Sequence, residues 1–97
     1  MKSNIIPEPL EFEWDKGNID KNFKKHGITN EEAEEVFFND ILVSEDEEHS
    51  KIEKRYQCLG LTDKGKKLFV SFTIRSNKVR VISVRNMNKK EKETYEK

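Results

Sequence analysis

Residues 67–86 read KLFVSFTIRSNKVRVISVRN, and only here do two strongly apolar runs meet across a tight polar turn. In residues 68–74 the even positions are all apolar, which is the period of a β-strand. The second run, 79–84, is rich in β-branched residues, which favour strands. The stretch therefore predicts a β-hairpin at the centre of a sheet.

The turn decides which side chains of the two strands share a face. A two-residue loop, at Ser76-Asn77 or at Asn77-Lys78, pairs the runs so that the numbers of paired residues sum to an odd number. One face is then predicted to hold Leu68, Val70, Phe72, Ile74, Val79, Val81, Ser83 and Arg85, and the other Phe69, Ser71, Thr73, Arg80, Ile82 and Val84. Both faces are substantially apolar, so we expect the hairpin to be covered on both sides, with arginines where the strands leave the core.

The remaining elements follow from periodicity and capping signals. Strands are predicted over 11–14, 41–43 and 55–62, and helices over 16–26, after the capping-box pair Thr29/Glu32 and after the similar pair Asn88/Glu91. The order β-α-α-β-β-β-β-α predicts an α+β fold with two N-terminal helices on a four- to five-stranded, mostly antiparallel sheet and a C-terminal helix at its edge. Residues 1–10, with two prolines and no period, predict a flexible arm before a single domain over 11–97.

Length and composition indicate one small, highly charged folded domain. The chain has 97 residues, of which 33% are hydrophobic and 39% charged, and the apolar residues fall in periodic blocks. The single cysteine, Cys58, excludes an internal disulfide and suits a reducing compartment. No apolar segment approaches the length of a membrane span, and no secretory leader is recognisable. We expect a cytoplasmic protein that does not contact a membrane.

The two halves of the chain carry opposite charge, although the formal net charge is zero. Residues 1–53 contain 6 Lys and 15 Asp+Glu, whereas residues 54–97 contain 13 Lys+Arg and 4 Asp+Glu. This asymmetry predicts a basic surface on the later strands and last helix, suited to an anionic partner such as nucleic acid. The alternative is that the halves attract each other across the fold or form ordinary solvated faces.

The sequence predicts no metal site and no cofactor. His26 and His49 are far apart and lack the cysteine or carboxylate spacing of zinc sites. Phosphate-binding glycine loops are absent, and nothing indicates a cysteine or serine hydrolase.

Histidines and cations are the remaining candidates for chemistry. They are Lys25, His26, His49, Arg55, Arg75, Arg80 and Arg85. Such groups can cut RNA without metal, because histidine can take the proton of a 2′-hydroxyl while arginines neutralise the charge that grows on the phosphate. Each residue also has a structural alternative. His26 can cap a helix, His49 can pair with Glu47 or Glu48, and Arg75 and Arg80 can be solvated. Arg55 and Arg85 are better candidates, because both lie at the ends of apolar strands.

Ordered motifs over residues 11–96 give the chain a resemblance to a known family. They are F-E-W-D at 12–15, N-x-x-K-H-G at 22–27, E-E-A at 31–33, H-S-x-x-E-x-R at 49–55, Arg75, I-S-x-R at 82–85 and E-x-x-x-Y at 91–95. In these motifs the chain resembles the BrnT family of type II toxins. It departs from the family pattern at Asn18 and Asn86, where basic residues are usual.

The resemblance implies a RelE-like fold and a ribonuclease that inhibits translation. It also implies neutralisation by a BrnA antitoxin whose DNA-binding half represses the shared operon, so that operator DNA is contacted only through the antitoxin. With the charge split, it predicts a metal-independent endoribonuclease that acts by 2′-hydroxyl attack.

We assign the candidate residues to two groups. The predicted catalytic residues are His49 for proton transfer, Glu53 to orient it or share its role, and Arg55, Arg75 and Arg85 on the scissile phosphate. The predicted RNA-binding residues are Lys25, His26 and Arg80. The competing hypothesis is a non-catalytic module that binds RNA or a partner in a repressor complex.

Overall fold

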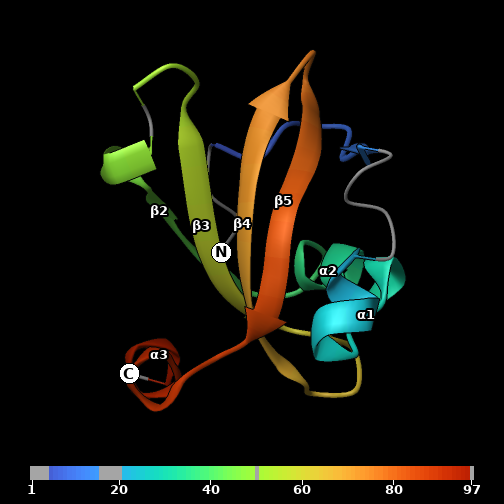
Figure 1. The fold of residues 1–97 in the computed structure, drawn as a ribbon, viewed down its shortest axis with the longest axis vertical. Coiled ribbons are helices and arrows are strands. Elements are labelled where there is room, and N and C mark those ends of the chain that lie inside the picture. Colours follow the sequence, from blue (N-terminus) through green and yellow to red (C-terminus); the bar gives the residue numbers. More distant parts are fainter. Residues whose placement is uncertain (1–4, 16–20, 50, 97) are drawn as a thin grey trace.

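The computed structural model describes residues 5–15, 21–49 and 51–96, and it has an α+β fold (Figure 1). Its elements are β1 (Phe12–Glu13), α1 (Lys21–His26), α2 (Asn30–Val36), β2 (Ile41–Glu45), the 3-10 helix η1 (Glu47–His49), β3 (Arg55–Leu61), β4 (Lys67–Arg75), β5 (Lys78–Asn86) and α3 (Lys89–Tyr95). The predicted order of strands and α-helices is confirmed. The first part of the expected helix, 16–20, and the family departure at Asn18 lie outside the described residues.

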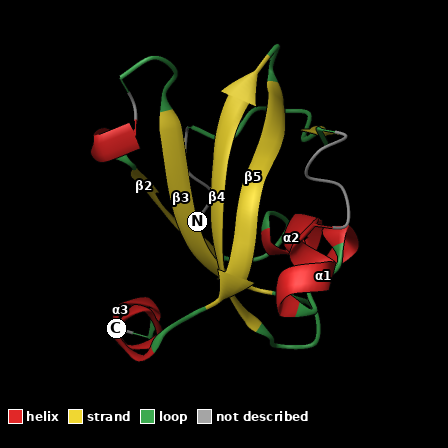
Figure 2. Ribbon diagram, in the orientation of Figure 1, coloured by secondary structure: helices red, strands yellow, loops and turns green. Residues whose placement is uncertain are grey.

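The five strands form one mixed sheet in the order β1-β5-β4-β3-β2. The pairs β2–β3, β3–β4 and β4–β5 are antiparallel, as predicted. The short β1 instead pairs in parallel with β5, with Phe12 opposite Val79. A long connection through two helices and three strands allows this parallel pairing, which local sequence signals could not reveal. The β4–β5 hairpin is the centre of the sheet, as Figure 2 shows.

Helix α2 covers one face of the sheet and supplies its core. The capping box predicted at Thr29 and Glu32 is present, and Val36 and Phe37 are fully buried. The Phe37 ring packs edge-on against Phe72 of β4, with 5.0 Å between ring centroids. Gly60 of β3 permits this approach, because a Cβ there would lie 2.5 Å from Cγ1 of Val36. The central hairpin therefore supplies the partner for α2, as expected.

The other two α-helices contact the sheet at β5 and at β3. Helix α1 contacts β5, and its Phe23 is 55% exposed. Helix α3 lies near the far end of β3 and β4, where Glu91 and Thr94 line a groove with Leu59 and Phe69. Because Gly60 faces α2, its neighbour Leu59 faces the opposite side, so α3 contributes to the second face. It also reaches the edge of the sheet, where the Tyr95 hydroxyl donates to the Asp40 carbonyl at 2.7 Å, just before the edge strand β2.

The predicted turn is confirmed, but the pairing beyond it contains a β-bulge. Ser76 and Asn77 form the loop, with φ of 52° and 62°, the left-handed values of a type I′ turn. Phe72 pairs with Val81, whereas Ser71 pairs with Ser83, so β5 has one extra residue. An extra residue reverses the facing of every side chain beyond it.

Because of the bulge, residues 83–85 of β5 lie on the opposite faces of the sheet from those predicted. Val84, expected on the face of Phe69, lies opposite Val70 and is 1% exposed in the core. Arg85, expected on the core face, lies opposite Phe69 instead. Ser83 changes face in the same way.

The start of the described chain and the helix lengths complete the fold. Within the arm expected over 1–10, residues 1–4 are outside the described part, and Ile6 and Pro7 are buried. None of the helices in the described residues is both long enough and apolar enough to cross a membrane.

Candidate active site

An open pocket of about 380 Å³ lies where β3 begins and β4 ends, beside η1. Its lining residues are Glu48, His49, Lys51, Ile52, Glu53, Arg55 and Arg75. Four of the five predicted catalytic residues are therefore brought together, from η1, the following loop and two adjacent strands. Figure 1 shows η1 beside the start of β3, far from α1 and α3.

His49 is held by Asp46, the residue just before η1. Nδ1 of its imidazole is 2.9 Å from Oδ2 of Asp46, and its backbone N–H donates to Oδ1 of the same carboxylate at 3.3 Å. The predicted partners of His49 were Glu47, Glu48 and Glu53. Asp46 was not predicted, although an aspartate immediately before a helical turn is a usual capping signal.

Glu53 is paired with Arg75 across the pocket. Nη2 of Arg75 donates to Oε2 of Glu53 at 2.7 Å. This hydrogen bond, with the charges of Arg75, Arg80 and Arg55, lowers the pKa of Glu53 below its ordinary value. Glu53 is thus a carboxylate at neutral pH, and its contact is with an arginine rather than with the histidine that it was expected to orient.

Arg55 and Arg80 lie in one row across the sheet. Thr73 of β4 is paired with Arg55 on one side and with Arg80 on the other. The Thr73 hydroxyl donates to the Lys54 carbonyl at 2.6 Å, which fastens the start of β3. Because neighbouring strands are about 4.8 Å apart, the two arginine backbones are separated by about 10 Å on the same face.

Arg80 is largely engaged by acidic residues of the early chain. Its guanidinium donates to Asp15 at 2.8 Å and lies 3.8 Å from Glu13. Only 20% of its side chain is exposed.

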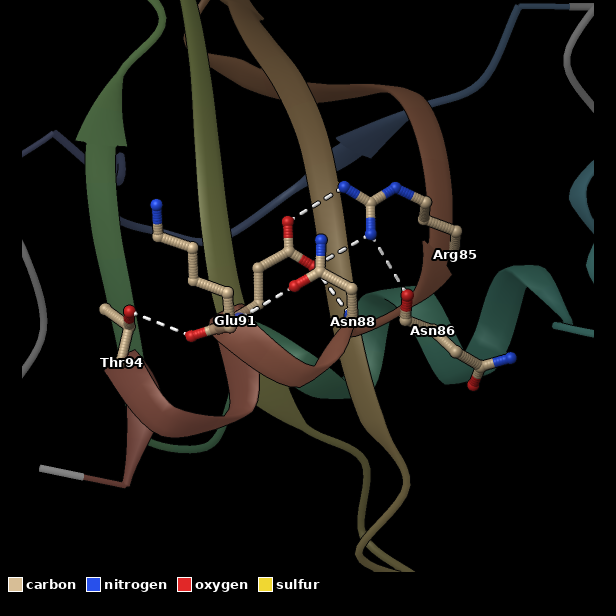
Figure 3. A network of polar contacts seen from close by, with 6 residues as sticks. Arg85, Asn86, Asn88, Glu91 and Thr94 are labelled. Atoms are coloured by element: carbon tan, nitrogen blue, oxygen red, sulfur yellow. Dashed lines mark hydrogen bonds and ion pairs between the residues drawn. The ribbon is translucent and has the colours of Figure 1, made fainter.

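Arg85, the fifth predicted catalytic residue, lies at the other end of the hairpin. It donates to both carboxylate oxygens of Glu91 at 2.8 Å and to the Asn86 carbonyl at 3.1 Å, as Figure 3 shows. Its guanidinium also stacks on Phe69, 4.1 Å from the ring centroid. From Phe69 to Arg75, β4 spans about 20 Å at the usual rise of a strand, so Arg85 is remote from the pocket.

Glu91 has two functions in this network. Its side chain accepts from the Asn88 backbone N–H at 2.9 Å, which completes the predicted capping box of α3. The Arg85 hydrogen bonds, followed by the Asn88 bond, lower the pKa of Glu91 despite its partial burial. The sequence predicted the cap but not the arginine that joins it to the sheet.

Lys25 and His26 are also remote from the pocket. They are exposed at the end of α1, which Gly27 terminates with a φ of 72°, as predicted. In Figure 1, α1 lies beside the far end of β5, whereas η1 is at the opposite end of the sheet. The two histidines of the sequence are thus in different parts of the molecule.

Ion pairs join the acidic first half of the chain to the basic second half. They are Arg75–Glu53, Arg80–Asp15, Arg80–Glu13, Lys66–Glu32 and Lys54–Glu45. The alternative considered above, in which the halves attract each other, is therefore part of the explanation of the charge split.

Two further observations describe the chemistry of the side chains. Burial raises the pKa of the Cys58 thiol to about 12, so this thiol is a poor nucleophile. Within residues 5–15, 21–49 and 51–96, no three His, Cys, Asp or Glu side chains are grouped to hold a metal ion.

Comparison with known proteins identifies the family. A search of the curated proteins found no match. The family model described as ribonuclease toxin, BrnT, of type II toxin-antitoxin system matches residues 14–91. The matched region includes the whole pocket and most of the sheet. The chain therefore belongs to the BrnT family of ribonuclease toxins of type II toxin-antitoxin systems.

Proposed function

We propose that this toxin is a metal-independent endoribonuclease whose active site is the pocket around His49. The observation that carries the proposal is the convergence of His49, Glu53, Arg55 and Arg75 on one open pocket. The group combines a proton-transfer side chain with two guanidinium groups, which are the components that RNA cleavage without metal requires.

The proposed reaction is attack of a ribose 2′-oxygen on the adjacent phosphorus. His49 removes the proton from the 2′-hydroxyl, the new O–P bond forms, and the bond from phosphorus to the 5′-oxygen breaks. The leaving oxygen takes a proton from a protonated group or water, which gives a 2′,3′-cyclic phosphate and a free 5′-hydroxyl. Arg55 and Arg75 bind the phosphate oxygens and stabilise the negative charge that develops on them.

Binding of a phosphate would require Arg75 to exchange its partner. Its present partner, Glu53, is 37% exposed and can be solvated when an RNA phosphate replaces it. Glu53 remains ionised, so it can share proton acceptance with His49 but does not begin as a proton donor.

The other predicted residues would contact RNA outside the pocket. Arg80 lies in the Arg55 row, and we propose that it extends the phosphate path along the sheet. Lys25 and His26 would bind the chain of RNA more distantly. Arg85 could bind phosphate only by giving up Glu91, so we propose a weaker contribution from it than from Arg75.

In the cell, we propose that cleavage inhibits translation and that a BrnA-type antitoxin neutralises the toxin. Expression of the chain alone should arrest growth, and co-expression of the antitoxin should restore it. A chain that serves only as a structural partner in a repressor complex would cause no growth defect when expressed alone.

The test is incubation of the purified, antitoxin-free protein with total RNA in EDTA. We expect fragments with 2′,3′-cyclic phosphate ends, and a loss of about 10²-fold or more in rate for His49→Ala. Lys64→Ala is the matched control, because Lys64 is an exposed cation in the turn at the opposite end of β3. Its rate should equal that of the wild type.

Three results would contradict parts of the proposal. Cleavage that EDTA abolishes would rule out metal independence. Full activity of His49→Ala would remove His49 from proton transfer. Intact RNA with the wild type would favour the binding module, or an enzyme that acts only on the ribosome.

A further inference from the structure

We propose that Asp46 is a positioning residue that fixes the tautomer and orientation of the His49 imidazole. Asp46 is outside every motif that indicated the family and was not among the predicted site residues. The inference rests on the proposed function only for the role of His49, because the contact itself is a structural property.

Asp46 binds His49 through both of its carboxylate oxygens. Oδ2 is 2.9 Å from Nδ1 of the imidazole, whereas Oδ1 accepts from the His49 backbone N–H at 3.3 Å. The Asp46 carbonyl accepts from the same N–H at 3.3 Å. The backbone and the ring of one histidine are therefore held by a single residue.

Asp46 is itself fastened to the strand that begins the pocket. Its backbone N–H donates to the Arg55 carbonyl at 2.8 Å. Its side chain is 20% exposed, whereas that of His49 is 58% exposed. Asp46, which is less exposed and is hydrogen-bonded to β3, thus holds the more exposed His49 near Arg55.

The chemistry of a carboxylate determines which tautomer it holds. An ionised aspartate only accepts hydrogen bonds, so a neutral imidazole beside it must carry its hydrogen on Nδ1. Nε2 then has the lone pair that can take a proton from a substrate hydroxyl. Once it has done so, the imidazolium forms an ion pair with the same carboxylate. Without Asp46, the ring would rotate and exchange tautomers in solvent.

Two substitutions separate this role from helix capping. Asp46→Asn keeps an oxygen that can accept from the His49 backbone, but its amide can donate to Nδ1 and so permit the wrong tautomer. Asp46→Ser keeps an oxygen that can cap the turn, but the serine side chain is too short to reach the imidazole ring. Glu47→Gln is the matched control, since it removes one charge from the same turn and leaves the imidazole contact in place.

The first measurement is the ¹⁵N spectrum of the neutral imidazoles in the wild type and the three variants. We expect the Nδ1–H tautomer for His49 in the wild type and in Glu47→Gln, and a shift toward the Nε2–H tautomer in both Asp46 variants. His26, exposed on α1, is an internal reference whose signals should not change. An unchanged His49 tautomer in the Asp46 variants would overturn the inference, whether or not the protein cleaves RNA.

The second measurement is RNA cleavage under single-turnover and steady-state conditions. We expect kcat to fall by about 10²-fold in Asp46→Asn while KM changes by less than about 3-fold, because orientation of a general base acts on the chemical step. Full kcat with an altered tautomer would overturn the positioning role. If the wild type cleaves no RNA but the tautomer depends on Asp46, the contact is supported and the proposed function fails.

Discussion

The two ends of the β4–β5 hairpin each carry an arginine–glutamate pair. The pairs differ in the number of contacts that the arginine makes. Arg75 makes one hydrogen bond to Glu53 at the pocket. Arg85 makes two to Glu91 and one to the Asn86 carbonyl, and it stacks on Phe69. The partners differ as well, because Glu53 is 37% exposed and Glu91 only 18%.

From this difference we infer that Arg75 is suited to bind a ligand and that Arg85 serves the fold. Arg75 lines an open pocket, and its acidic partner is partly exposed to solvent. Arg85 joins α3 to the sheet through a carboxylate that also caps the helix, so its loss affects several contacts at once. Residue type alone does not distinguish the two.

The strongest test of this difference is to replace each arginine by alanine. We expect Arg75→Ala to lower the rate of RNA cleavage by about 10²- to 10³-fold, the usual loss of one group that stabilises transition-state charge. Its free energy of unfolding should change little, because an ion pair at the protein surface contributes little to stability. RNA cleavage and urea denaturation of the same preparations measure both quantities.

Arg85→Ala should give the opposite pattern. We expect a loss of about 1–3 kcal/mol in stability, from the broken paired hydrogen bonds and the unpaired Glu91, with a smaller loss of rate than in Arg75→Ala. If Arg85→Ala were fully stable and inactive, Arg85 would belong with the phosphate-binding residues.

Glu91→Gln tests the acidic side of the structural pair. It keeps an oxygen that can cap α3 but removes the charge that Arg85 binds, so we expect about 1 kcal/mol of destabilisation. Glu53→Gln, the matched change at the pocket, should alter stability less. Thermal unfolding of the two variants at one pH makes the comparison.

The pH dependence of stability should separate the same two glutamates. The pKa of Glu91 is lowered in the folded state, so its stabilising effect is present above the ordinary value of 4.5 and is lost as the pH falls through the folded pKa. Glu91→Gln cannot titrate there, so the acid side of its stability curve should be flatter than that of the wild type. The pKa of Glu53 is also lowered, but this group is well exposed, so Glu53→Gln should flatten the curve less. Urea denaturation between pH 3 and 7 gives the curves, and equal slopes in all three proteins would contradict the assignment.

The smallest expected effect concerns the turn between the two ends. Changing Ser76-Asn77 to Asn-Gly should stabilise the protein by about 0.5 kcal/mol, because both residues have positive φ and Asn-Gly is the preferred type I′ sequence. Cleavage should be unchanged, since Arg75 keeps its strand position. A gain in stability with a loss of activity would show that the loop itself contacts RNA.

Much of the fold was predictable because its signals are local. The hairpin, both capping boxes and the stop at Gly27 depend on residues within a few positions of one another. The motif at 49–55 likewise brought His49, Glu53 and Arg55 together, since its members are close along the chain. Arg75 required the pairing of β3 with β4, which alternating apolar runs made predictable.

The features that local signals did not predict concern contacts over longer distances. The parallel pairing of β1, the exposure of Phe23 and the placement of α3 depend on how elements pack. The bulge in β5 leaves no clear signal in the alternation of Val81, Ile82 and Val84, since all are apolar. It nevertheless moves Arg85 to the other face.

The amino-acid sequence was enough to predict the type of domain, the order of its elements, the family and most of the residues in the pocket, because periodicity, caps and motifs are local properties of the chain. Only the three-dimensional packing shows which arginine lies at the pocket and which acid holds His49. Those assignments depend on register and on three-dimensional distance, and one extra residue in β5 was enough to separate Arg85 from the arginines of the pocket.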